Sequence, residues 1–156
     1  MLLYFDNGDP YACGVTPYVY RPVNDKDVSP RIILTILIEG LQTQAFVDTG
    51  GIFVIAPQVA HQLRLDPTSG LPAPELSLRG SLITGVFHRV LLTLLASEGD
   101  SLAIEATAFV PNLAPDQEWV EDFPCILGMN NCFERLRFAV DPTADMFYFG
   151  ELAGDY

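Results

Sequence analysis

The chain has few basic residues to balance its acidic ones. Its 156 residues include 8 Lys and Arg against 20 Asp and Glu, which gives a formal net charge of −12 at pH 7. The basic residues are scattered along the sequence with no cluster. Because a surface this acidic repels phosphate, we expect no nucleic-acid partner.

Cysteine is also scarce. Cys13, Cys125 and Cys132 are an odd number of thiols, so they cannot all pair within one chain. Their spacing is not that of a zinc site. We therefore expect three reduced thiols, as in a cytoplasmic protein, with no metal and no other cofactor.

Long apolar runs are absent as well. None reaches the roughly 18 to 20 residues that a helix needs to span a bilayer. The apolar start, residues 1–5, has no basic flank and ends at Asp6, which is unlike a signal peptide. The sequence therefore predicts a cytoplasmic protein with no membrane partner.

The composition is that of a globular protein, with 49% hydrophobic and 18% charged residues. The length favours a single domain. Residues 1–30 hold four prolines and a polar run, so we expect an irregular N-terminal extension with one short strand within 15–20. The domain then spans residues 31–150, and residues 151–156 form a C-terminal tail.

Short apolar, β-branched runs between turn signals predict an all-β, barrel-like domain with one or two short helices. The strands expected are 32–38, 42–47, 52–55, 103–110 and 137–141, together with a long hairpin over 76–95 that turns within 80–85. Pro57 opens a short helix. The first two strands form a hairpin that delivers Asp48.

Asp48 follows the apolar strand directly and precedes Thr49 and Gly50, so one carboxylate lies on a turn that glycine permits. Far downstream, an apolar pair and a glycine, Ile126, Leu127 and Gly128, precede a short helix expected over 130–136 and the strand 137–141. An Asp-Thr-Gly with a downstream Ile-Leu-Gly is far more specific than either motif alone.

With these motifs the chain resembles the retropepsin-like family, the single-domain aspartic proteases of retroviruses and their cellular relatives, over about residues 31 to 150. The resemblance implies a retropepsin-like acid protease barrel acting on a peptide or protein substrate. Such enzymes need two carboxylates that share a proton. The chain has one Asp-Thr-Gly, and Asp66 and Asp141 are each followed by proline. The expected enzyme is therefore a homodimer with one Asp48 from each subunit.

The resemblance also implies roles for individual residues. Asp48 is the expected catalytic acid and base, Thr49 would hydrogen-bond across the dimer axis, and Gly50 would allow the two loops to approach. Ile126, Leu127 and Gly128 would pack behind this loop. The flap over the substrate would consist of Gly80, Ser81, Leu82, Ile83, Thr84 and Gly85. The terminal strand 146–149 would pair across the dimer interface.

One position departs from the family, which usually has Ala or Ser where this chain has Gly51. The missing methyl or hydroxyl keeps a second function open, an inactive retropepsin-like dimer that binds peptides or another protein. A third possibility is a monomeric small-ligand barrel in which Asp48 is a turn residue. His61 and His88 are expected to be structural, and Trp119 is expected to pack a loop against the core.

Overall fold

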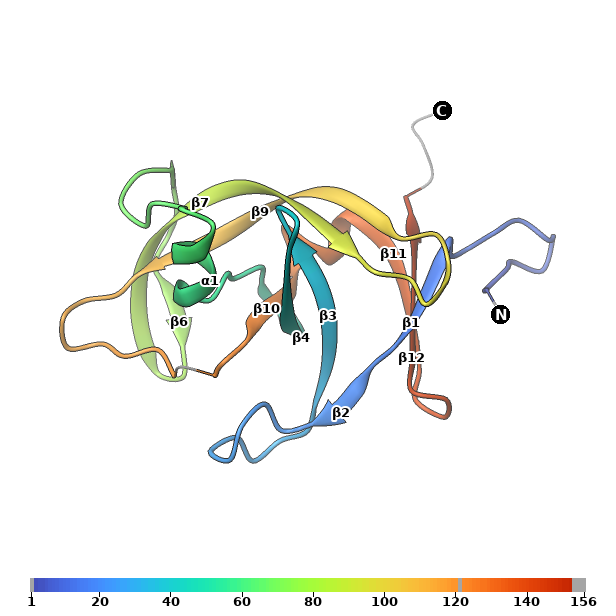
Figure 1. The fold of residues 1–156 in the computed structure, drawn as a ribbon, viewed down its shortest axis with the longest axis horizontal. Helices are drawn as coiled ribbons and strands as arrows, with labels where there is room; N and C mark the ends of the chain where they lie inside the picture. Colours follow the sequence, from blue (N-terminus) through green and yellow to red (C-terminus); the bar gives the residue numbers. More distant parts are fainter. Residues whose placement is uncertain (1, 121, 153–156) are drawn as a thin grey trace.

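The computed structural model describes residues 2–120 and 122–152, and it confirms the all-β prediction (Figure 1). The strands are β1 (Gly14–Pro17), β2 (Val19–Arg21), β3 (Arg31–Ile38), β4 (Leu41–Ile52), β5 (Leu71–Pro72), β6 (Leu76–Leu78), β7 (Ser81–Leu94), β8 (Glu98–Gly99), β9 (Leu102–Asn112), β10 (Cys125–Asn130), β11 (Leu136–Asp141) and β12 (Met146–Glu151). The helices of the described residues are α1 (Pro57–Gln62) and the 3-10 helix η1 (Phe133–Arg135). Within the described residues, no helix is long and apolar enough to cross a membrane.

The strands form two open sheets. The smaller sheet has the order β11-β12-β1-β8, and the larger follows the path β10-β4-β3-β7-β5, with β2 beside β3 and with β6 and β9 beside β7. β10 runs parallel to β4, whereas β3 runs antiparallel to it. The parallel pairing brings the ends of β4 and β10 to the same edge of the sheet.

The predicted hairpin before Asp48 is confirmed. β3 pairs with β4 from Ile33↔Phe46 to Ile38↔Leu41. The two residues between the strands, Glu39 and Gly40, have φ angles of 49° and 81°, as a type I′ hairpin turn requires. This tight turn fixes the register, and the register sets where β4 places Asp48.

β4 has buried residues on both faces. Ala45 belongs to the main core, which also includes Leu34 and Leu127. Phe46 belongs to a second cluster with Phe123 and six other buried residues, Val23, Ile33, Val54, Ile83, Phe109 and Ile126. Side chains alternate along a strand, so Asp48 lies on the face of Phe46 and the second cluster.

Residues 2–30 are tied into both sheets. β1 lies between β12 and β8, and β2 pairs with β3, where the sequence predicted one short strand in an irregular extension. β12 pairs with β11 along one edge and with β1 along the other. The predicted pairing of 146–149 across a dimer interface is therefore wrong, because the chain's own β1 occupies the edge that a partner would need.

Two local predictions also need correction. The hairpin that joins β6 to β7 turns at Arg79 and Gly80, with φ angles of 50° and 79°, so of the predicted turn range 80–85 only Gly80 is in the turn. The helix expected over 130–136 shrinks to η1, since Asn130 still belongs to β10 and Asn131, with a φ of 68°, adopts a left-handed conformation that ends the strand. The expected strand 52–55 is reduced to the end of β4 and isolated bridges at Val54.

Candidate functional site

Asp48 lies at a bulge near the end of β4. Asp48 pairs with Gly128 and Ile52 pairs with Asn130, so Thr49, Gly50 and Gly51 face Met129 alone. The sharp turn expected at Gly50 is therefore a bulge within a continuous strand, and Gly50 does not use a left-handed φ. Bulges of this kind free backbone groups from the sheet and redirect side chains.

One of the freed groups binds the carboxylate. The backbone N–H of Gly50 donates to Asp48 Oδ1 at 3.1 Å. Asp48 is half-buried, whereas Thr49 and Gly50 are exposed. The strand and the Gly50 hydrogen bond together hold the carboxylate in one orientation, and water can still reach it.

The predicted support residues lie beside this bulge. Ile126 pairs with Phe46 and Leu127 with Val47, and the two enter opposite clusters of the core. Gly128 is buried directly against Gly51, and a β carbon on Gly128 would overlap the Gly51 carbonyl group. The structure thus brings the two sequence motifs together, and glycine at position 128 is what allows their close approach.

Gly51, which departs from the family pattern, has more room. A β carbon there would lie 3.4 Å from Asp48 Oδ2, an ordinary van der Waals distance. Its φ angle is outside the left-handed region. Alanine would therefore fit at position 51 and would contact the carboxylate.

The six predicted flap residues lie at the tip and in the first half of β7. Gly80 is in the turn, Ser81, Leu82 and Thr84 are exposed, and Ile83 is buried in the second cluster. Gly85 pairs with Pro111 on β9, and a β carbon there would overlap the Val110 carbonyl oxygen. Because Thr84 also pairs with Asn112 on β9, the mobile part of a flap at this place would consist of residues before Thr84.

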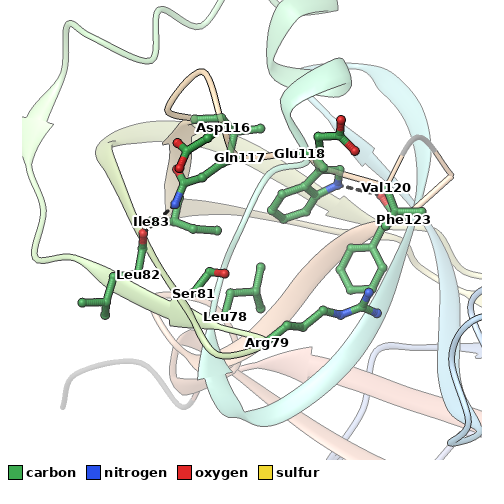
Figure 2. Close-up of a pocket in the computed structure, with 12 residues that line it drawn as sticks. Leu78, Arg79, Ser81, Leu82, Ile83, Asp116, Gln117, Glu118, Val120 and Phe123 are labelled. Atoms are coloured by element: carbon green, nitrogen blue, oxygen red, sulfur yellow. Dashed lines mark hydrogen bonds between the residues drawn. The ribbon is translucent and has the colours of Figure 1, made fainter.

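Opposite this tip lie Trp119, which packs a loop against the core as expected, and Phe123, which sequence reasoning missed. A cavity of about 380 Å³ separates the tip from the loop over residues 113–123, whose described residues are 113–120, 122 and 123. The lining of the cavity includes Arg79, Trp119 and Phe123 (Figure 2). Asp48 does not line the cavity, but the ring of Phe123 lies 5.3 Å from that of Phe46, centroid to centroid. The two aromatic residues at positions 119 and 123, in a loop that also carries Asp116, Glu118 and Asp122, were the available signal.

An ion pair also lies near the strand that carries Asp48. Arg31 Nε donates to Asp27 Oδ2 at 3.2 Å, and the Arg31 guanidinium lies 5.1 Å from the centroid of the Phe46 ring. The hydrogen bond from Arg31 lowers the pKa of Asp27, and the N–H of Val23 adds to this effect. This pair fixes the loop before β3.

Other reactive groups in the described part of the chain offer no competing site. Burial raises the pKa of Cys125 to about 11 and that of Cys132 to about 12, so both thiols stay protonated at neutral pH. His88 Nε2 lies 2.8 Å from the Asp66 carbonyl oxygen, a structural contact. No group of three or more His, Cys, Asp or Glu residues in the described ranges is placed to hold a metal ion.

Comparisons with known proteins return little. No protein-family model matches the sequence, and no curated protein matches it. Among solved structures, the chain is similar to a retropepsin-like aspartic protease from Rickettsia conorii, with 17% sequence identity, a TM-score of 0.49, and coverage of 88% of this chain and 95% of that one. The identity and the TM-score are too low for this likeness to assign a family or a function.

Proposed function

We propose that the protein is an aspartic endopeptidase that works as a homodimer, with one Asp48 from each chain activating a single water. The observation that supports this most is the setting of Asp48. Its carboxylate is half-buried, is held by the Gly50 N–H, and lies on a bulge backed by the buried Gly128. Such fixed placement of an acid at a strand end is what acid catalysis requires.

The chemistry requires two carboxylates. At close range they cannot both ionise, so they share one proton. The ionised carboxylate takes a proton from water as the water oxygen attacks the peptide carbonyl carbon, and the protonated carboxylate donates to the carbonyl oxygen. In the collapse of the resulting diol, the carboxylate that is now ionised takes a proton from one hydroxyl as the carbonyl re-forms. The C–N bond breaks, and the other carboxyl gives the proton it took from water to the leaving nitrogen. Asp48 supplies half of this pair, and a second copy supplies the other half.

For the two Asp48 carboxylates to share a proton, the bulge of one chain has to meet the bulge of the other at the dimer axis. In an alternative dimer, β2 of one chain would pair edge to edge with β2 of the other. Strands β3 and β2 of each chain would then lie between the two β4 strands. Five steps of about 4.8 Å then separate those strands, too far for a shared proton. We therefore assign the two-fold contact to the bulges themselves. The exposed Thr49 would donate its hydroxyl hydrogen across the axis, and Gly50 would allow the approach.

The substrate we propose is an extended peptide or a protein segment between the bulges and the β6–β7 hairpin. The exposed Ser81, Leu82 and Thr84 are the hairpin residues available to it. No cofactor takes part in this reaction. We place the enzyme in the cytoplasm, where Cys13, Cys125 and Cys132 would stay reduced.

The test compares wild type with Asp48→Asn. The substitution keeps the size of the side chain and one oxygen to accept the Gly50 N–H, but it removes the carboxylate that takes the proton from water. Both proteins are incubated with a mixed peptide library at several pH values, and the products are read by mass spectrometry. We expect products from wild type alone. If a confirmed wild-type dimer gives none, the protein is instead a dimer that binds peptides or partner proteins.

A further inference from the structure

The tip of the β6–β7 hairpin is fastened to the loop over residues 113–123 by the side-chain amide of Gln117. Its Nε2 donates to the Leu82 carbonyl oxygen at 2.8 Å. Its Oε1 accepts from the N–H of Ala114 at 2.9 Å, within the turn that the loop makes. Both ends of the amide are thus engaged, so the group that reaches the hairpin is itself held in place.

A second contact fastens the turn itself. The guanidinium carbon of Arg79 lies 4.1 Å from the centroid of the Phe123 ring, a cation–π distance. Phe123 is 4% exposed, and Trp119 packs against it at 5.5 Å between ring centroids. The indole N–H of Trp119 also donates to the Phe123 carbonyl oxygen at 3.3 Å. Arg79 therefore packs on the buried ring of Phe123, which Trp119 contacts in turn.

The cavity of about 380 Å³ lies between these two contacts. The hairpin contributes Leu78 and Ile83 to its lining, and the loop contributes Leu113, Trp119 and Phe123. Figure 2 shows the Gln117 amide reaching toward Leu82 at one side and the Arg79 guanidinium below Phe123 at another. A hairpin that swings away must break both contacts, and it would expose Ile83 and one face of Trp119.

We propose that Gln117 and Arg79 form a clip that holds the hairpin against the residue 113–123 loop of its own chain and so closes the cavity beside Trp119. The hairpin opens when these two contacts break. The clip itself does not rest on the proposed protease activity. Its consequence does: in an active dimer, opening the clip admits a substrate side chain to the cavity.

Two substitutions test the clip separately. Gln117→Glu replaces the Nε2 donor by an oxygen that repels the Leu82 carbonyl, yet it keeps an acceptor for Ala114. Arg79→Asn removes the guanidinium and creates Asn-Gly, the preferred sequence for a two-residue type I′ turn, so the hairpin itself is not weakened. Gln62→Glu, at an exposed position on α1, is the control. All three substitutions make the net charge more negative by one, so a general charge effect would also appear in the control.

Hydrogen exchange and fluorescence measure opening in the full chain without any substrate. Trp119 is the chain's only tryptophan, so acrylamide quenching of its emission reports on the loop directly. We expect quenching to increase in both variants. We also expect the amides of residues 76–83 to exchange roughly 2- to 10-fold faster than in wild type, because a two-stranded hairpin released from the loop is itself only marginally stable. The control should match wild type.

Two results would overturn the proposal. In the first, both variants exchange and quench as wild type does, which means that the contacts do not hold the hairpin. In the second, exchange accelerates throughout the domain, which means that the contacts support the whole fold and not a local gate. A protein without cleavage activity can still give the expected result, so this test and the test of the proposed function fail independently.

Discussion

Gly128 lies so close to Gly51 that a β carbon on Gly128 would overlap the Gly51 carbonyl group. The bulge that carries Asp48 therefore depends on a residue from a different part of the sequence. We expect Gly128→Ala to push β10 away from the bulge and to lower the free energy of unfolding by about 1 to 3 kcal/mol, the usual range for overpacking. Urea unfolding measures this directly. An unchanged midpoint would mean that the two strands are not in close contact.

Gly51→Ala serves as the matched comparison on the other side of this contact. The new methyl would lie at an ordinary distance from the Asp48 carboxylate, and the backbone does not need a left-handed φ. Because alanine restricts the unfolded chain, we expect a gain of about 0.4 to 1 kcal/mol in unfolding free energy and no loss of peptide cleavage. A loss as large as that of Gly128→Ala would contradict the described geometry of the bulge.

The ion pair between Arg31 and Asp27 predicts a pH dependence of stability. The hydrogen bond from Arg31 holds the pKa of Asp27 in the folded chain below its value of about 3.9 in the unfolded chain. The contribution is therefore complete above that pH and is lost as the pH falls through the folded pKa. Asp27→Asn should cost about 1 kcal/mol at neutral pH, since Arg31 is partly exposed.

Below about pH 4 the gap between wild type and Asp27→Asn should narrow, because the carboxylate becomes protonated first in the unfolded wild-type chain and at lower pH in the folded one. Urea unfolding of both proteins at neutral pH and at about pH 3 measures the two gaps. A gap that stays constant across this range would show that the side chain stabilises the loop by its shape and not by its charge.

The position of β1 between β12 and β8 allows a prediction of what happens when the chain is shortened from its N-terminus. A chain that begins at residue 10 keeps β1 and should fold, although it loses the contact between Phe5 and Arg137. A chain that begins at residue 24 loses β1, β2 and the buried Val15 and Tyr18, each worth on the order of 1.5 to 3 kcal/mol. We expect the shorter chain not to fold, as read by thermal unfolding. A normal melting curve for it would mean that residues 1–23 are dispensable.

Local signals in the sequence predicted the parts of the fold that local chemistry determines. The hairpin before Asp48 follows from two apolar strands around Glu39 and Gly40, and α1 begins at Pro57 as expected. The turn of the β6–β7 hairpin was placed too late because Arg79, which adopts a positive φ, carries no turn signal. The helix after Gly128 was overestimated because Asn131 interrupts it.

Contacts between distant segments were harder to predict. The packing of Gly128 behind the Asp48 loop was expected only because both residues belong to recognisable motifs, and their pairing in the sheet was not predicted. Nothing local in residues 14–17 indicates that they pair with β12, near the other end of the chain. The Gln117 and Arg79 contacts were missed for the same reason, since each residue type is common on loops and only the folded chain brings Gln117 to the β6–β7 hairpin and Arg79 of that hairpin to Phe123.

A mixing experiment tests the shared site most directly. Wild type is mixed with an equal concentration of Asp48→Asn, and in a second sample with a fourfold excess of the variant. Subunits are allowed to exchange, and the rate of cleavage is measured per wild-type chain. If each active site needs Asp48 from two copies, the rate per wild-type chain should fall to about one half and about one fifth, the fractions of wild-type chains that find a wild-type partner. A rate that stays constant in both mixtures would mean that each chain carries a complete site, and it would contradict the half-site account of Asp48.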